Sequence, residues 1–281
     1  MLHSSIIECQ VDWYRNLFTT KKKKTNEPSH VYIVQLLEKL TPTQLYQLQS
    51  GDGNPIANMY QINSSAGMAV NYYKLFERTH KNVSVGFEWK DSIPLLGSSK
   101  PANIDVKYEL DGIVHFVECK FLEPYESENH KNNPAYMDTR RYPFNCYKEC
   151  WRELIEKENE FKYTDFAQLC RHLMAIYRYY LESNELLNKR IVLESVSWKM
   201  TKTFLNHYAS MGNSTSEFEN RIEIIGIEQH KCNQLFSDFL KKIHWGNCSF
   251  IAHHYNDPEM LDAIREANRF DDFKKQYFIE D

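Results

Sequence analysis

The sequence has few residues that interrupt regular structure, with only 9 glycines and 9 prolines in 281 residues. It contains no run of about eighteen apolar residues, and its first ten residues lack the basic start and apolar core of a signal peptide. The seven cysteines form no C-x-x-C pair, and their odd number does not suit a disulfide framework. These absences disfavour membrane spans, secretion and structural zinc, and they predict a cytoplasmic protein with reduced thiols.

Common nucleotide and hydrolase motifs are also missing, since the sequence has no P-loop, no G-x-G-x-x-G and no G-x-S-x-G. Acidic residues exceed basic ones by 38 to 34, for a formal net charge of -4. The basic run Lys21 to Lys24 has two interpretations, of which an exposed solvated loop is favoured over an arm that contacts phosphates. His253 and His254 would alternate across a predicted strand, so they could not bind one metal together.

Hydrophobic periodicity predicts three parts: an N-terminal helical extension (1–63), a core (64–198) with an insertion (124–163), and a C-terminal extension (199–281). In the core we expect a helix at 64–80, strands at 83–89, 103–110 and 113–121, a helix at 165–182 and a strand at 190–198. The C-terminal extension is predicted as β-α-β-α, with strands at 221–227 and 249–255 and helices at 232–243 and 258–268. The whole pattern is that of an α/β protein with a mixed sheet.

The most informative segment is a predicted hairpin whose turn is Asp111-Gly112. A two-residue Asp-Gly turn fixes the register, so that cross-strand partners have residue numbers that sum to 223. Asp105 and Glu118 then confront each other on one face of the hairpin. Directly opposed side chains have Cβ atoms about 4.5 to 5.5 Å apart, where two like charges destabilise a sheet.

A divalent cation between these carboxylates would remove the repulsion, and Mg²⁺, with Mn²⁺ as a substitute, suits such oxygen ligands. Lys120 lies two residues beyond Glu118 and therefore on the same face, where it could steady a hydroxide nucleophile or a developing negative charge. The backbone carbonyl of Cys119 is a further possible ligand. The sequence has five [DE]-x-K triplets against roughly three expected by chance, so the triplet alone carries little information. An ordinary solvent-facing hairpin with a Glu/Lys pair is the alternative interpretation.

Asp105 and the triplet Glu118-Cys119-Lys120, placed between a preceding helix and strand and a following helix and strand, resemble the core of the PD-(D/E)XK nuclease superfamily. This resemblance covers roughly residues 64–198 and implies the restriction-endonuclease-like fold, an αβββαβ core with helices on both faces. It also implies that Asp105 and Glu118 bind Mg²⁺ while Lys120 assists the attacking water. The sequence departs from the superfamily pattern in having Ile104 where the name has proline, and in its long insertion.

Five further positions carry weaker signals. Glu88 is similar to the extra acidic residue that some members use as a ligand of the metal or water, and an exposed strand glutamate is the alternative. Gln168 resembles the glutamine that recurs on this helix in RecB-like branches, and His172 lies one turn further on. Arg171 and Arg178, seven residues apart, could contact phosphates together with Lys120 and His172, although solvated arginines are common.

The sequence, together with this resemblance, predicts a Mg²⁺-dependent nuclease that hydrolyses phosphodiester bonds, with no membrane partner and with a homodimer as one option. The resemblance implies DNA in preference to RNA as the substrate. The alternative is a catalytically inactive nucleic-acid-binding or interaction module on the same fold, which would bind without depending on metal. The two are distinguished by whether cleavage occurs and requires metal.

Overall fold

The computed structural model describes residues 2–17, 36–51, 55–61, 63–91, 101–126 and 134–279. Five strands form one sheet in the order β1-β2-β3-β4-β5. Strands β1, β2 and β3 are antiparallel neighbours, whereas β3, β4 and β5 run parallel. Their bounds are Gly86–Lys90 (β1), Asn103–Leu110 (β2), Ile113–Lys120 (β3), Arg190–Ser197 (β4) and Cys248–His254 (β5). The mixed sheet is as predicted.

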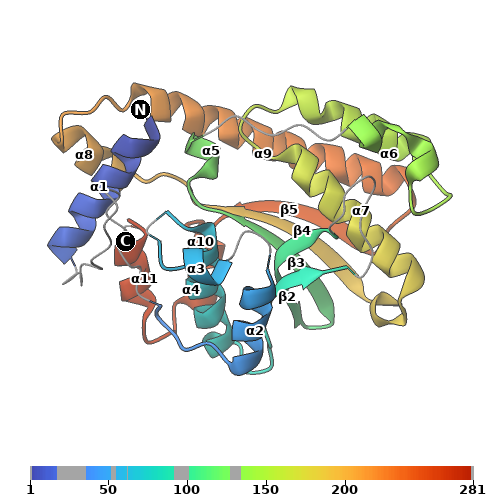
Figure 1. The fold of residues 1–281 in the computed structure, drawn as a ribbon, viewed down its shortest axis with the longest axis horizontal. Coiled ribbons are helices and arrows are strands. Elements are labelled where there is room, and N and C mark those ends of the chain that lie inside the picture. The colour runs from blue at the N-terminus through green and yellow to red at the C-terminus, as the bar shows by residue number, and fades with distance from the viewer. Residues whose placement is uncertain are drawn as a thin grey trace.

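Helices cover both faces of this sheet, as Figure 1 shows. Because side chains alternate along a strand, Val114 and Phe116 of β3 enter one core while Val117 and Cys119 enter the other. The first core is covered by α6 (Lys148–Ile155), α7 (Phe166–Glu182) and α9 (Ser216–Lys242). The second is covered mainly by α4 (Ser65–Thr79), α10 (Pro258–Ile264) and α11 (Phe270–Gln276).

Local capping by side chains sets several of the helix starts. Ser64 accepts a hydrogen bond from the Gly67 N–H and caps α4, and Thr41 forms a capping box with Gln44 at the start of α2. Helix α7 is capped by Asp165, the residue at which the sequence pattern predicts this helix to begin. The other elements are α1 (Leu2–Leu17), α2 (Pro42–Ser50), α3 (Pro55–Asn58), α5 (Glu123–Glu126), α8 (Lys202–Ser210) and 3₁₀ turns at 134–137, 139–141, 156–160 and 184–186.

The two extensions share a core with the central part of the chain. Ile6 from α1 and Tyr277 after α11 belong to the same buried cluster as Val106 and Val117 of the sheet. The boundaries expected near residues 63 and 199 stay a prediction. The basic run Lys21 to Lys24 lies outside the described residues.

The predicted strand at 221–227 is wrong, because this segment belongs to the 27-residue helix α9. The C-terminal extension is therefore α8-α9-β5-α10-α11 and not β-α-β-α. Buried Phe218, Ile225, Cys232 and Phe236 recur at helical spacing over the whole of α9 and outweigh the short isoleucine-rich stretch. The expected helix at 258–268 ends at Ile264, and α11 follows it.

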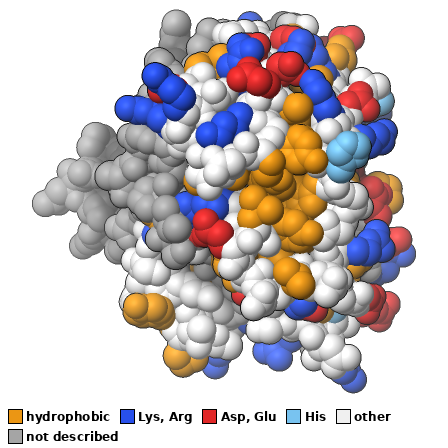
Figure 2. Space-filling model, turned by 90° about the vertical axis from the view of Figure 1, so that its right-hand side faces the viewer, with side chains coloured by type: hydrophobic (Ala, Val, Ile, Leu, Met, Phe, Trp, Pro, Cys, Tyr) orange, Lys and Arg blue, Asp and Glu red, His pale blue; other side chains and the backbone are white. Residues whose placement is uncertain are grey.

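One side of the molecule carries exposed apolar side chains. Leu181 at the end of α7 is 49% exposed and Leu187 beyond it is 54% exposed. Figure 2 shows hydrophobic side chains gathered into one patch on the face at the right of Figure 1. None of the helices in the described ranges is both long and apolar enough to cross a membrane.

Candidate metal centre at the end of strand β3

The β2–β3 hairpin closes through the predicted turn. Asp111 and Gly112 have φ angles of 51° and 74°, the left-handed values that a type I′ turn needs at both central residues. Leu110 pairs with Ile113 and the ladder continues to Val106 and Val117. The predicted register is confirmed for these pairs.

The two strands separate directly beyond this last pair, where Asp105 and Glu118 come next. The Asp105 carboxylate accepts a hydrogen bond of 2.8 Å from the backbone N–H of Cys119. The Asp105 side chain therefore accepts the hydrogen bond that a backbone carbonyl of β2 would accept in a regular ladder. Because the N–H and C=O of one strand residue point to the same neighbour, the Cys119 carbonyl also lies on the side of Asp105, as its expected ligand role requires.

Glu118 is only 2% exposed and is held by two cationic or hydrogen-bonding side chains. Lys120 Nζ lies 2.7 Å from its Oε1, and His172 Nε2 lies 2.8 Å from its Oε2. Burial alone would raise the pKa of Glu118, but Lys120 and His172 outweigh it and lower this pKa to about 2. Glu118 is thus an ionised, oriented carboxylate inside the protein.

Asp105 shows the opposite shift. Its pKa is raised well above the usual range, first because burial desolvates the carboxylate and then because Glu118 and Glu88 carry like charges nearby. Lys120 and the hydrogen bond from the Cys119 N–H lower the pKa of Asp105, but by less than burial and the like charges raise it. Carboxylates crowded in this way fit a bound cation, since a divalent ion would neutralise the repulsion and replace lost solvation.

Lys120 carries its positive charge into the same cluster. Burial would lower the pKa of its ammonium group, but Glu118, Glu123 and Asp105 raise the pKa above its ordinary value. Its side chain remains 24% exposed while the ammonium group pairs with Glu118. The group is therefore a fixed cation next to the proposed metal ligands.

Glu88 supplies a third carboxylate through a local distortion of β1. Its φ of 54° is uncommon for a residue with a long side chain, and it lies between two paired positions of the β1–β2 ladder, level with Asp105. Its carboxylate accepts a hydrogen bond from the Asn103 amide. Gly51 makes room for it, because a Cβ there would lie 2.5 Å from Glu88 Oε2.

Helix α7 places both His172 and Gln168 beside Glu118, but the two residues have different surroundings. His172 is buried and contacts Glu118, so it supports a carboxylate and is not placed to bind nucleic acid directly. Gln168, one turn earlier, lines a cavity together with Glu118 and Lys120. Its backbone N–H bonds to Asp165 as part of the helix cap.

The two arginines of α7 do not form a common phosphate-binding face. Arg178 is 1% exposed and forms a buried ion pair with Asp91 directly after β1, so its expected contact with phosphate is wrong. The spacing of seven residues indicated one helix face but not that the neighbouring strand ends in a buried aspartate. Arg171 is half-buried and remains a candidate for such a contact.

The cavity beside Glu118 and Lys120 has a volume of about 160 Å³. Its floor consists of the ends of β3 and β4, including Ser195 and Ser197, and its walls come from the start of α7 and the middle of α9. Ile225 and Gln229 of α9 lie where the sequence pattern predicts a strand and a loop. Sequence reasoning therefore missed this part of the site.

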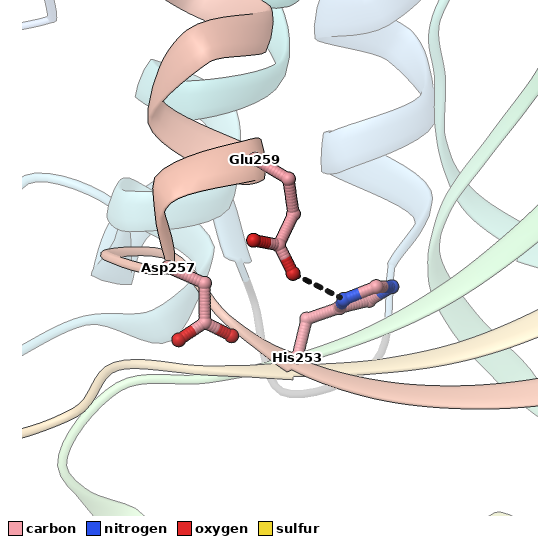
Figure 3. A group of neighbouring side chains, drawn as sticks. All are labelled: His253, Asp257 and Glu259. Atoms are coloured by element: carbon pink, nitrogen blue, oxygen red, sulfur yellow. Dashed lines mark ion pairs between the residues drawn. The ribbon is translucent and has the colours of Figure 1, made fainter.

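A second group of possible metal ligands lies at the far end of β5. Within the described ranges, His253, Asp257 and Glu259 offer one ligand atom each within 4.8 Å of one another (Figure 3). Asp257 already accepts a hydrogen bond of 2.6 Å from the His254 N–H at the start of α10. Acidic residues are ordinary in the first turn of a helix, so these carboxylates need no metal to explain them.

The mixed sheet, the helices on both faces and the acidic strand ends with their lysine define the restriction-endonuclease-like class of α/β proteins. The chain belongs to the family described as restriction endonuclease associating with ARP, which matches residues 50–207, more than half of the sequence. No curated protein and no solved structure matched significantly. The family indicates a nuclease-related role, and such families generally use divalent metals.

Proposed function

We propose that the protein is a Mg²⁺-dependent nuclease that hydrolyses phosphodiester bonds of DNA. The observation that carries this proposal is the cluster at the end of β3, where the ionised Glu118, the crowded Asp105 and the Lys120 ammonium group lie together. A merely structural hairpin has no reason to bring a half-buried carboxylate close to the buried, like-charged carboxylate of Glu118. The family description supports the same activity.

Asp105, Glu118 and the Cys119 carbonyl would hold the metal, and Glu88 would act on it directly or through water. A divalent ion bound there would polarise the scissile phosphate and lower the pKa of a water molecule. His172 keeps one oxygen of Glu118 oriented through its 2.8 Å hydrogen bond. Asn103 does the same for Glu88.

Lys120 acts by its charge. Its ammonium group is held 2.7 Å from Glu118 Oε1, so it is pre-oriented and needs little rearrangement to donate a hydrogen bond. It would orient the attacking water and stabilise negative charge that develops on the phosphate, the type of stabilisation that is strongest in a partly dry site. Arg171 would add a contact to a neighbouring phosphate. A cytoplasmic location and a homodimer stay predictions.

The decisive experiment measures cleavage of plasmid DNA, of linear single- and double-stranded DNA and of RNA, with Mg²⁺ or Mn²⁺ and with EDTA. We expect cleavage only with metal. Asp105→Asn should abolish it, and Lys120→Met should slow it roughly 10²- to 10³-fold, the usual effect of removing one such charge-stabilising group.

A matched control is Lys107→Met, because Lys107 also ends a [DE]-x-K triplet but pairs with Glu185 at 2.6 Å. This variant should cleave like the wild type. Circular dichroism checks that all variants fold. Metal-independent binding without cleavage of any substrate would support the inactive binding module instead, and cleavage that survives Lys120→Met unchanged would contradict the assigned role of Lys120.

A further inference from the structure

A cavity lies next to Glu118 and Lys120 of the candidate metal centre. Its volume of about 160 Å³ is close to that of an engineered cavity of about 150 Å³ that accepts benzene, so it can hold one aromatic ring. Glu118 and Lys120 form one end of it, while Asp105 and Glu88 do not line it. The cavity therefore extends away from the metal centre, over β4 toward α9.

The wall of this cavity is held in place by one buried carboxylate. Glu228 of α9 is 5% exposed and accepts hydrogen bonds from three consecutive backbone N–H groups, those of Lys162, Tyr163 and Thr164, at 2.5, 3.0 and 2.7 Å. These contacts fix the segment that leads into α7 against α9. The cavity is thus a built feature with a defined shape.

The polar groups that line the cavity suit the edge of a nucleobase. Gln229 Nε2 donates to Ser197 Oγ at 3.0 Å, and this bond orients the amide while its carbonyl oxygen stays available. Among the described residues, the Gln168 side-chain amide forms no hydrogen bond. Glutamine amides offer a donor and an acceptor side by side, which is the pattern that reads base edges. Leu169 and Ile225 add apolar contacts for the ring.

An anion would fit the same cavity poorly. Glu118, Glu123 and Asp165 line it against the single cation Lys120, and each of the three carboxylates is already anchored by hydrogen bonds within the protein. Their negative charge disfavours a second phosphate group and leaves a neutral polar ring as the better occupant.

We propose that this cavity is a pocket for one nucleobase of the substrate, which leaves the base stack and inserts next to the scissile phosphate. The inference rests on the proposed nuclease function. Extrusion of a base costs least from single-stranded or mismatched DNA, so the enzyme should cut these faster than a fully paired duplex.

The test uses oligonucleotides that the wild type cuts, each with one 2-aminopurine, whose fluorescence rises when the base leaves the stack. Binding is followed with an Asp105→Asn background that does not cleave. We expect a fluorescence rise at one position near the cut. Gln229→Ala, and Ser195→Leu, which fills the cavity, should abolish this rise and weaken binding at least about fivefold.

Gln234→Ala on the exposed side of α9 and Ser249→Leu on β5 are matched controls, and they should keep the rise. For the control on metal binding, Gln229→Ala and Ser195→Leu are made in the protein that keeps Asp105. Calorimetric titration should show that both bind Mg²⁺ as the wild type does. If the wild type cleaves while Gln229→Ala binds and cleaves equally well and keeps the full fluorescence rise, or if the wild type itself gives no rise at any position, the pocket is refuted and the nuclease stands. If the wild type cleaves nothing, both proposals fail.

Discussion

The contact of Glu228 with the 162–164 segment should be one of the strongest single contributions to stability outside the sheet. In Glu228→Gln, one carboxylate oxygen becomes an amide nitrogen. Lys162 and Thr164 bond to different oxygens, so at least one backbone N–H then faces a donor in place of an acceptor. A buried donor without a partner costs about 1–3 kcal/mol, and the remaining bonds lose the assistance of the charge.

We therefore expect the free energy of unfolding to fall by about 3 kcal/mol, which corresponds to a Tm lower by about 6–12 °C for a chain of this size. Urea and thermal unfolding followed by far-ultraviolet circular dichroism measure both quantities. Glu223→Gln is the control, because Glu223 is exposed on the same helix and loses the same charge. If the two variants unfold within about 0.5 kcal/mol of each other, the three hydrogen bonds do not hold the wall as described.

Two further substitutions test contacts around the metal centre. His172→Leu removes the hydrogen bond to Glu118 and should weaken Mg²⁺ affinity or activity about 10- to 100-fold, with partial recovery in His172→Gln; equal Mg²⁺ titrations of all three proteins would exclude this positioning role. Arg178→Met leaves Asp91 buried without its ion-pair partner and should lower the free energy of unfolding by about 3–5 kcal/mol. Exposed Arg190→Met serves as its control, and urea denaturation that fails to separate the two would contradict the buried pair.

The arrangement of the candidate metal centre could be predicted from the sequence because its geometry is local. A two-residue turn with Asp111-Gly112 admits few backbone conformations, and the register of the hairpin follows from it. That register is enough to bring Asp105 next to Glu118. The distortion at Glu88 could not be derived in this way, since it depends on Gly51, which is distant in sequence.

The strand prediction within helix α9 is wrong because local preference and tertiary packing disagree there. Ile222, Ile224, Ile225 and Ile227 are β-branched and favour a strand over a short window. The buried positions of α9 recur at helical spacing across 27 residues, and that longer pattern decides the structure. The prediction for Arg178 also failed because of tertiary packing. The pattern of helix α7 does not show that Asp91, which follows strand β1, forms a buried ion pair with Arg178.

The position of α9 bears on how activity and specificity divide along the chain. Asp105, Glu118 and Lys120 all lie in the segment 50–207 that matches the family, whereas Ile225, Glu228 and Gln229, which build one wall of the cavity, lie beyond it. In the proposed function, the residues that would cleave the phosphodiester bond all belong to the first set. If the cavity selects a base, proteins that share the matched segment but differ in the helix after it should keep the chemistry and change the base that they prefer. The substitution Gln229→Glu keeps the size of the side chain but removes the amide group that donates to Ser197 Oγ and adds a negative charge to the cavity. It should therefore disturb the orientation of the oxygen that faces the base and alter which nucleotide lies at the cut, while leaving the need for metal intact. Sequencing of the cleaved ends from a randomised DNA pool would measure this, and an identical base preference in both proteins would count against specificity residing in α9.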